Sequence, residues 1–325
     1  MAFLIAIGVG VVLTPIAHAV GLFTRIVDHP DGGGLKIHRR PIPLTGGIAV
    51  TAAILVALAV ADRLPSAWVL GAVGLALLAG LIDDVLSLPA TLRLLAQAGS
   101  GLLLVGAGVR LEALGPLEGP AVVLLVLATT NAVNLIDGQD GLAGGLGAVA
   151  ALGLAPLLAW QGEAAGATLA LATAGALIGF LVLNRPPARI FLGNGGAYAV
   201  GVLLAVQVGS LGGHGWRPLL AAALCLGVFA FELLFTVARR AGTRRPLAGG
   251  GDRSHSYDLV ALRAGDRPTA TLLFLALGIV CAALALVVGR APLALGAAIV
   301  AAASGAGWMW GRRLLAGGRR RIGVA

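Results

Sequence analysis

Residues 120–160 read PAVVLLVLATTNAVNLIDGQDGLAGGLGAVAALGLAPLLAW, two long apolar runs on either side of a short acidic and glycine-rich stretch. A helix that crosses a hydrocarbon core of ~30 Å needs about 20 apolar residues, and each run approaches that length. The segment therefore predicts two membrane-spanning helices joined by a loop that carries polar side chains.

The composition of the 325-residue chain extends this prediction to the whole protein. Hydrophobic residues make up 58%, charged residues 11%, and the mean hydropathy is +0.97. A typical soluble domain has about 25% charged residues, so a soluble globule, a disordered or fibrous chain and a nucleic-acid-binding domain are excluded. The net charge of +9 is therefore interpreted against a bilayer. Cys225 and Cys281 lie inside apolar runs, which excludes a disulfide framework and a CxxC metal site.

Apolar runs separated by Pro, Gly and charged residues predict about eleven membrane-spanning helices. They lie near residues 3–23, 44–61, 67–82, 92–108, 120–136, 142–160, 166–184, 196–212, 218–237, 269–288 and 292–310. Ala17-His18-Ala19 imitates a signal-peptidase site, but the segment lacks a positive n-region, so we expect the first helix to remain uncleaved. The predicted fold class is an all-α polytopic membrane protein, with one integral membrane domain over residues 1–325.

The positive charges predict the orientation of these helices. Nineteen of the 23 Lys and Arg residues fall on one face, and the other face holds Arg63, Arg110, Arg217 and Arg290. The positive-inside rule makes the richer face cytoplasmic, so we expect the N-terminus outside and the C-terminus in the cytoplasm. The expected cytoplasmic segments are the loops 24–43, 83–91, 137–141, 185–195 and 238–268 and a basic tail at 311–325.

Acidic residues gather at the cytoplasmic ends of two of these helices. Asp83 and Asp84 end the third, and paired acids near a bilayer are costly unless they bind a cation or exchange protons. A polar stripe with a repeat of three residues ends the fifth and consists of Asn131, Asn134, Asp137 and Asp140. A structural hydrogen-bond ladder is the alternative, but two like charges disfavour it. The four carboxylates are enough to hold Mg²⁺ together with substrate phosphates.

The last large loop is rich in arginine and contains one histidine. Arginine suits bidentate phosphate binding, and His255 can donate or accept a proton near neutral pH. For the arginines of residues 239–245, a solvated basic cluster near anionic lipid is an equal alternative. Arg253 and His255 lie beside two aspartates, which favours a site. Glu232 lies inside the ninth span, where lining a cavity and pairing with an arginine both stay open.

Taken in order, these segments resemble the polyprenyl-phosphate N-acetylhexosamine-1-phosphate transferases, which include phospho-MurNAc-pentapeptide and GlcNAc-1-phosphate transferases. NAVNLIDGQDGL at residues 131–142 is similar to the family's NxxNxxDGxDGL stretch and is the most specific element. Gly46-Gly47 and the Asp83-Asp84 pair are similar to further signatures. The likeness runs from Lys36 to Asp258.

The resemblance implies transfer of a sugar 1-phosphate from a UDP-sugar to a polyprenyl phosphate, with release of UMP, as an initiating step of cell-envelope glycan synthesis. We expect this at the cytoplasmic (inner) membrane of a bacterium. A UDP-GlcNAc-like donor is preferred, because the pentapeptide branch carries a run of histidines that this chain lacks. The expected cofactor is Mg²⁺, with Mn²⁺ as an alternative. The partners are the donor, the acceptor and the bilayer, without nucleic acid, and a homodimer is left open.

The resemblance also assigns roles to residues. The catalytic residues it implies are Asp83, Asp84, Asp137, Asp140 and His255. The metal ligands it implies are Asp137, Asp140 and Asn194. The substrate-binding residues are Lys36, His38, Asn131, Asn134, Asn184, Phe191 and Arg253. Asp83 and Asp84 would handle the acceptor phosphate and its proton. Asn184 and Phe191 would hold and stack the uracil, and His255 would contact the diphosphate.

Three positions depart from the family pattern. The family's FxGDxGS appears here as FLGNGGA, so that Asn194 replaces a metal-binding aspartate and one negative charge is missing. Ser87 stands where many members carry a third acid after the Asp pair. His255 is followed by Ser256 and Tyr257, so a second histidine is absent.

Two other classes of function remain as alternatives. A catalytically impaired homologue that binds nucleotide or lipid is supported by Asn194. A proton-coupled transporter or flippase would require intramembrane acids along a path to the midplane and an inverted repeat, whereas the acids gather on one face. CDP-alcohol phosphotransferases use a related acidic motif, but Gly141-Leu142 replaces their Ala-Arg.

Overall fold

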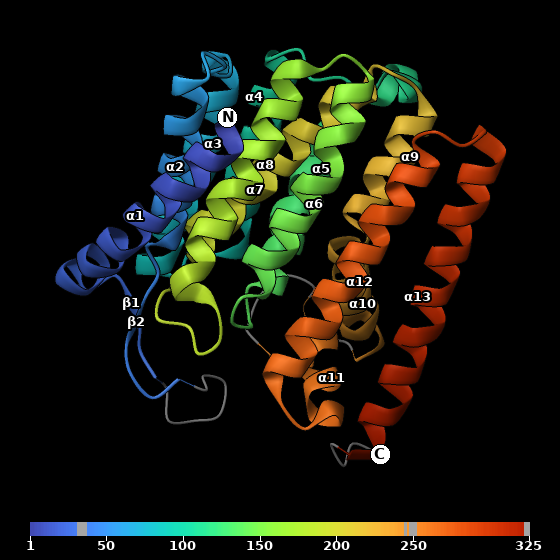
Figure 1. Cartoon of the computed structure of the whole chain (residues 1–325). Coiled ribbons are helices and arrows are strands. Elements are labelled where there is room, and N and C mark those ends of the chain that lie inside the picture. The colour runs from blue at the N-terminus through green and yellow to red at the C-terminus, as the bar shows by residue number, and fades with distance from the viewer. Residues whose placement is uncertain (31–37, 244–245, 247–251, 322–325) are drawn as a thin grey trace.

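The computed structural model describes residues 1–30, 38–243, 246 and 252–321, with side chains as far as residue 316. The chain is almost entirely helical (Figure 1). Its elements are α1 (Ala2–Thr24), β1 (Val27–Asp28), β2 (Ile42–Pro43), α2 (Gly46–Val60), α3 (Ala67–Leu86), α4 (Ala90–Gly106), the 3-10 helix η1 (Glu112–Leu117), α5 (Glu118–Ile136), α6 (Leu142–Trp160), α7 (Ala164–Asn184), α8 (Gly193–Gly212), α9 (Trp216–Cys225), α10 (Gly227–Gly242), α11 (Ser256–Ala264), α12 (Arg267–Val288) and α13 (Leu293–Arg321).

Within the described residues, eight helical segments are long and apolar enough to cross a membrane, and α9 with α10 forms a ninth that is bent by 73°. Each of the eleven expected runs coincides with one of these segments or with α2 or α4. α2 and α4 are apolar but only 15 and 17 residues long. At about 1.5 Å per residue both are shorter than a ~30 Å hydrocarbon core. The polytopic α-helical class is confirmed, whereas the number of eleven crossings stays a prediction.

Helix α8 forms the centre of the bundle. Nearly all of its residues are buried, and it packs against α2, α3, α5, α6, α7 and α9. α1 packs on α2 and α7, and α12 packs on α6, α9 and α11. The N-terminus of α8 therefore lies where the ends of several helices meet.

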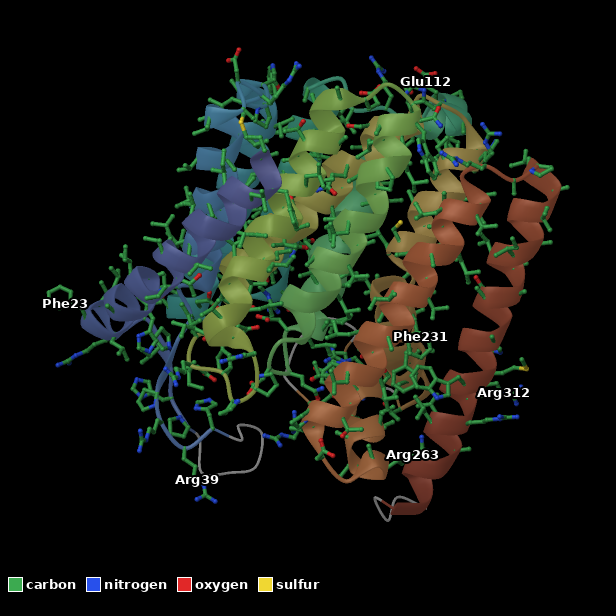
Figure 2. The ribbon with its side chains drawn as sticks, viewed as in Figure 1. Phe23, Arg39, Glu112, Phe231, Arg263 and Arg312 are labelled. Carbon is green, nitrogen blue, oxygen red and sulfur yellow. The ribbon has the colours of Figure 1, made fainter. Side chains whose placement is uncertain are left out.

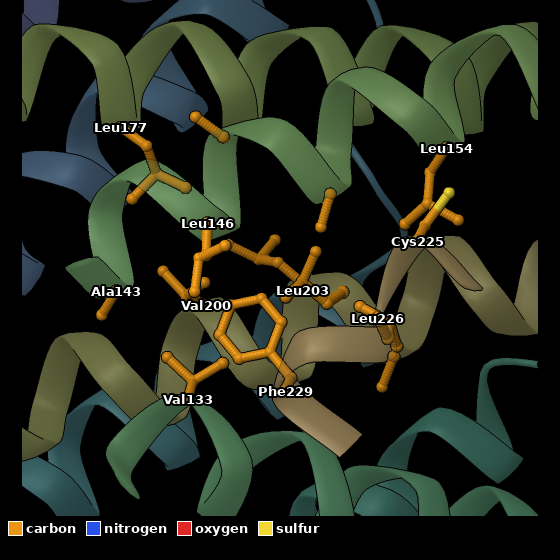
Figure 3. Packing of buried hydrophobic residues seen from close by; sticks show 14 of the residues in the cluster. Val133, Ala143, Leu146, Leu154, Leu177, Val200, Leu203, Cys225, Leu226 and Phe229 are labelled. Atoms are coloured by element: carbon orange, nitrogen blue, oxygen red, sulfur yellow. The ribbon is translucent and has the colours of Figure 1, made fainter. Parts of the chain in front are cut away.

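The core beside α8 is filled by aliphatic side chains around one aromatic ring. Phe229 of α10 lies among Val133 of α5, Leu146 of α6 and Val200 of α8 (Figure 3). Within a bilayer, packing of this kind holds helices together, because lipid tails are as apolar as leucine. α1 and α13 leave most of their apolar residues exposed, as expected for helices that face lipid.

The polar segments lie at one end of the bundle, where Figure 1 shows the β1–β2 hairpin, the α7–α8 loop and α11. The structure differs from the expected loops in extent. Asp83 and Asp84 lie within the last turn of α3, because the backbone hydrogen bonding of the helix continues to Ser87. Asn194 belongs to the first turn of α8, and α13 continues through Arg321 into the expected tail. Val27 and Asp28 pair antiparallel with Pro43 and Ile42, a short ladder that the all-α prediction omits.

Candidate active site

Asp83 is the most connected carboxylate at this end of the bundle. It is buried, and its Oδ1 accepts a hydrogen bond from the Leu88 N–H at 2.8 Å. Its Oδ2 accepts from Asn194 Nδ2 at 2.9 Å and from the Tyr198 hydroxyl at 3.3 Å, and Arg93 Nη1 lies 3.6 Å away. Both carboxylate oxygens of Asp83 thus have hydrogen-bond donors, and these compensate the burial of a negative charge.

Asp84 caps the N-terminus of α8. Its two carboxylate oxygens accept hydrogen bonds from the backbone N–H groups of Asn194, at 3.0 Å, and Gly195, at 3.3 Å. A carboxylate is favoured there because the first N–H groups of a helix lack partners within the helix. Gly193, which begins α8, has φ +74°, and a Cβ atom would stand 2.8 Å from Asp84 Oδ2 and 2.5 Å from the Leu44 carbonyl oxygen. Position 193 therefore requires glycine.

Asp137 directly follows α5 and faces the same residue from the other side. Its carboxylate accepts a hydrogen bond from the Gly193 N–H. Burial raises the pKa of Asp137 well above its ordinary value, and the charges of Asp84 and Asp140 raise it further, while the Gly193 N–H acts in the opposite direction. Asp84 and Asp137 thus flank Gly193 as a pair of like charges that favours a proton or a cation between them.

Asn194 connects two of the predicted polar groups. Its Nδ2 donates to Asp83, and its Oδ1 accepts from Asn134 Nδ2 at 2.5 Å. Both ends of its amide group are therefore engaged. Asn131, one turn before Asn134, instead donates to Gln97 Oε1 at 2.7 Å and to the Leu127 carbonyl at 2.8 Å. The predicted polar stripe is therefore divided between two contacts. Asn134 is linked to Asp83 through Asn194, whereas Asn131 joins α5 to α4.

Asn184 and Asp140 join the α5–α6 and α7–α8 loops. The buried Asn184 accepts from the Gly141 N–H at 3.1 Å and donates to the Ile190 carbonyl at 2.8 Å. Asp140 Oδ2 accepts from the Ala188 N–H at 2.9 Å. Both side chains hold the loops in place in this structure.

Two cavities of about 310 Å³ and 430 Å³ adjoin the α7–α8 loop. The first is lined by residues that include Gln139, Asp140, Pro186, Pro187, Arg267 and Thr271. The second lies against Arg185, Arg189 and the same two prolines. Small-molecule sites have volumes of about 300–1,000 Å³, so the cavity beside the acidic loop lies at the lower end of that range.

Phe191 and His38 meet at the edge of the site. Their ring centroids are 5.6 Å apart in an edge-to-face arrangement. His38 also contacts the Asp28 carboxylate through Nε2 at 2.9 Å and the Arg40 carbonyl through Nδ1 at 2.8 Å. The β1–β2 hairpin therefore brings His38 to the α7–α8 loop. Lys36 lies outside the described residues.

His255 reaches the acidic loop through its neighbour. Its Nδ1 lies 2.8 Å from Glu232 Oε1, and its ring stacks on Tyr257 with centroids 5.2 Å apart. The Tyr257 hydroxyl donates to the Leu135 carbonyl at 3.0 Å, and a Cβ atom at Gly138 would stand 2.2 Å from it. The structure thus links the predicted histidine to the DGQDG loop through Tyr257.

The arginines of the last loop are divided between two environments. Asp252 binds Arg239 Nη2 at 2.9 Å through both oxygens and Arg240 Nη2 at 3.2 Å. Burial raises the pKa of Asp252, but the Arg239 guanidinium and the Ser254 N–H outweigh it and hold the pKa below 3.8. Arg239 and Arg240 therefore form a buried clamp, which decides against a solvated cluster for these two. Arg253 lies near Asp258. Burial raises the pKa of Asp258, and the positive charge of Arg253 acts in the opposite direction.

The predicted metal ligands do not form a cage made of protein alone. Among the residues that the structure places, His, Cys, Asp and Glu side chains form no group of three or more that could hold a metal ion. Mg²⁺, however, is commonly held by one or two carboxylates and by substrate phosphates. Asp84 and Asp137 on either side of Gly193 fit such a shared site.

The sequence did not predict four residues that contact the candidate site: Arg93, Tyr198, Glu232 and Tyr257. Tyr198 and Glu232 stand inside apolar runs, where a single polar side chain is the only available signal. Arg93 stands ten residues after Asp83, and this spacing gives no periodic pattern that would link the two residues. The contacts of these four depend on helix packing across the bundle.

Comparisons with known proteins support the family resemblance that the sequence motifs indicate. A family model described as Glycosyl transferase family 4 matches residues 66–211, which include the acids and Asn194. A probable undecaprenyl-phosphate N-acetylglucosaminyl 1-phosphate transferase of Bacillus subtilis is 28% identical, over 85% of this chain and 81% of that protein. A decaprenyl-phosphate N-acetylglucosaminephosphotransferase of Mycolicibacterium smegmatis is 28% identical, over 91% and 88%.

A phospho-N-acetylmuramoyl-pentapeptide-transferase of Synechococcus elongatus is 36% identical over 62% of this chain and 64% of its own length. The residues matched by the family model include the DGQDG loop and the N-terminus of α8, where the candidate site lies. The family model and these relatives support the superfamily that the sequence motifs indicated, the polyprenyl-phosphate N-acetylhexosamine-1-phosphate transferases.

Proposed function

We propose that this chain transfers an N-acetylhexosamine 1-phosphate from its UDP derivative to a polyprenyl phosphate and releases UMP. Asp83, Asp84 and Asp137 come from two separate helix ends and meet at the N-terminus of α8, and this arrangement carries the proposal. The names of the relatives describe the same class of reaction. The reaction is proposed at the cytoplasmic face of the bacterial inner membrane.

GlcNAc 1-phosphate is the proposed group. The two relatives named for N-acetylglucosamine align over 85% and 91% of this chain, against 62% for the pentapeptide transferase. His255 followed by Ser256 and Tyr257 also differs from a histidine run.

In the proposed reaction an oxygen of the lipid phosphate attacks the β-phosphorus of the donor. The bond from that phosphorus to the bridging oxygen breaks, and UMP leaves with the bonding electrons. Such reactions depend mostly on positioning and on neutralising charge. Asp83 and Asp84 are proposed to receive the acceptor phosphate and its proton. Burial raises the pKa of Asp137 well above its ordinary value, which favours a proton or a cation at this carboxyl group.

Mg²⁺ is the proposed cofactor, with Asp84 and Asp137 as its carboxylate ligands beside the phosphates. When bound, it supplies positive charge to the diphosphate. Asp140 and Asn194 are the other predicted ligands. Asp140 already accepts a hydrogen bond from the Ala188 N–H. Asn194 already donates to Asp83 and accepts from Asn134. A minor shift of either side chain would be needed for it to ligate.

The nucleoside is proposed to occupy the space beside the α7–α8 loop. Phe191, at the end of this loop, offers an aromatic ring beside His38 and lines neither cavity, and Asn184 fixes the loop that carries it. The cavity of about 310 Å³ lies beside Asp140 at the same loop. Arg253 and Lys36 stay proposed phosphate contacts.

A catalytically impaired homologue is the second candidate, and Asn194 favours it. Where the family carries a carboxylate, this chain carries an amide with both ends hydrogen-bonded. Such a protein would still bind nucleotide or lipid.

The test is release of UMP by the purified protein in detergent with a polyprenyl phosphate. UDP-GlcNAc and UDP-MurNAc-pentapeptide are compared, each with Mg²⁺ and with EDTA. We expect Mg²⁺-dependent release from UDP-GlcNAc. Faster release from the pentapeptide donor would overturn the sugar assignment, and the absence of release from any UDP-N-acetylhexosamine would favour the impaired homologue.

A further inference from the structure

Glu232 lies inside α10 and is fully buried, with 0% of its surface exposed. Its carboxylate is surrounded by donors. Oε1 contacts His255 Nδ1 at 2.8 Å and the Thr236 hydroxyl at 3.0 Å. Oε2 accepts from the Ser256 N–H at 3.2 Å and from the Ser256 hydroxyl. Four contacts to two oxygens satisfy a carboxylate that would otherwise be costly to bury.

These contacts determine which nitrogen of His255 carries the proton. A carboxylate oxygen accepts hydrogen bonds, so Nδ1 must donate to it. In the neutral imidazole Nε2 is then the acceptor, and in the imidazolium form it is a second donor. Either way, Nε2 is the ring nitrogen left for a ligand.

The ring is also fixed in orientation. It stacks on Tyr257 with only 3° between the ring planes, and the Tyr257 hydroxyl is bound to the Leu135 carbonyl at the end of α5. Glu232 and Tyr257 therefore hold His255 from two directions, and Tyr257 connects it to the segment that leads into Asp137.

The bend between α9 and α10 places Glu232 for this contact. The two helices differ in direction by 73°, and α10 packs against α5 and α11. A straight helix through Leu226 would continue along α9 and would not carry Glu232 to the start of α11.

We infer that Glu232 is a positioning residue, which sets the Nδ1–H tautomer of His255 and holds Nε2 toward the phosphates of the substrates. This inference rests on the proposed transferase function. Carboxylate–imidazole pairs do the same elsewhere, because the partner of one ring nitrogen determines the chemistry of the other.

The first test is Glu232→Gln, assayed with UDP-GlcNAc and a polyprenyl phosphate. Glutamine preserves the size of the side chain but removes the charge. We expect kcat to fall by about 10- to 100-fold, the range seen when the hydrogen-bond partner that orients a metal-binding histidine is removed, with KM for the donor within threefold of the wild type. Glu163→Gln is the matched control. Glu163 also contacts a histidine, His214, at 3.0 Å, but it precedes α7 at the end of that helix that is away from Asn184 and the candidate site. It should leave both constants unchanged.

A double-mutant cycle separates positioning from a merely structural role. If Glu232 acts through His255, Glu232→Gln should add nothing to the loss caused by His255→Gln. Additive losses, or wild-type kcat in Glu232→Gln, would overturn the inference. The melting temperatures of the variants show whether each is folded.

A third measurement does not depend on turnover. The ¹⁵N NMR spectrum of protein labelled at histidine reports which ring nitrogen is protonated, and His255→Gln identifies the signal. We expect a protonated Nδ1 in the wild type and a mixture of tautomers in Glu232→Gln. A proton on Nε2 alone in the wild type overturns the inference, even if the proposed transferase activity has itself failed.

Discussion

Asn194 differs from the family's aspartate by one amide group, and the structure shows what that group does. Its Nδ2 donates to Asp83, and its Oδ1 accepts from Asn134. A carboxylate at this position would face the Asp83 carboxylate across a distance of about 3 Å, where like charges repel strongly unless a proton or cation lies between them. The Asn194 amide donates a hydrogen bond to Asp83 at the place where an aspartate would need a proton or a cation between the two carboxylates.

Asn194→Asp should therefore make the stability of the protein depend on Mg²⁺. Without divalent cations, we expect a lower melting temperature than the wild type, because two buried carboxylates repel each other. Millimolar Mg²⁺ should raise the melting temperature of Asn194→Asp more than that of the wild type. Asn131→Asp is the control, since Asn131 contacts Gln97 on α4 and not Asp83. An equal Mg²⁺ effect on all three proteins would contradict this account.

Asp83 and Asp137 are expected to be indispensable for UMP release. Asp83→Asn removes an acceptor of three hydrogen bonds, and Asp137→Asn removes a group that can carry a proton. Each should lower kcat by at least about 100-fold, the lower bound for acid–base groups. Asp62→Asn is the control. Asp62 is exposed between α2 and α3, and its φ of 51° suits asparagine. Wild-type rates in Asp83→Asn or Asp137→Asn would refute the site.

At the scale of elements, the close contact of α3 with α8 holds the acids in place. A Cβ atom at Gly80 of α3 would stand 2.4 Å from the carbonyl carbon and oxygen of Asn194 and from the Gly195 nitrogen. The backbones of the two helices touch at this point, one turn before Asp83 and Asp84. Any side chain there must push α8 away from both carboxylates.

Gly80→Ala should therefore reduce stability and activity together. Overpacking of this kind costs about 1–3 kcal/mol, and a backbone atom cannot move aside as a flexible side chain can. We expect a lower melting temperature and at least a tenfold loss of UMP release. Gly74→Ala, on the same helix but with open space around its Cβ position, should preserve both. A harmless Gly80→Ala would show that α3 and α8 do not touch here.

The clamp of Asp252 with Arg239 and Arg240 joins the end of α10 to the segment before α11. Its pH dependence follows from the lowered pKa of Asp252. A carboxyl group with a lowered folded-state pKa stabilises the protein above its unfolded value of 3.8, and that contribution is lost as the pH falls through the folded value.

Asp252→Asn should lower the stability near pH 7 by about 3 kcal/mol, because two buried guanidinium groups lose their partner. The difference from the wild type should shrink as the pH falls below 3.8 and vanish below the lowered folded-state pKa, where the wild type also lacks the charge. Melting temperatures from pH 3 to pH 8 measure this. A difference that is constant over the range would mean that the charge of Asp252 does not matter.

The sequence predicted the helices better than it predicted their breaks. Apolar runs placed every long helix, and DGQDG marked the α5–α6 loop, since glycine and acid residues stand out in an apolar sequence. The bend at Leu226 was missed, because residues 224–231 (LCLGVFAF) contain no polar side chain or proline and the direction of the chain there depends on packing against α5 and α12. The Glu232–His255 contact was missed for the same reason. Asn131 was grouped with Asn134, although α4 draws it away from the acids.

At the scale of the molecule, the candidate site occupies one end of the bundle. Asp83, Asp137 and Asn184 lie at the C-terminal ends of α3, α5 and α7. Asn194 lies at the N-terminal end of α8, which runs in the opposite direction. Figure 2 shows Arg39 and Arg263 at this end and Glu112 at the other. Substrates that carry a long lipid and a charged nucleotide both meet such a site at the membrane surface. The orientation of the bundle therefore determines which compartment supplies the nucleotide.

Cysteine labelling in cells can measure that orientation. In a background with Cys225→Ala and Cys281→Ala, we place single cysteines at Arg39→Cys and Glu112→Cys, both exposed and at opposite ends. A maleimide that cannot cross the membrane should label Glu112→Cys in intact cells. It should label Arg39→Cys only after permeabilisation, because the positive-inside rule puts the arginine-rich end in the cytoplasm. Labelling with the reverse pattern would place the site outside, where UDP-sugars are absent, and would remove the basis for the proposed reaction.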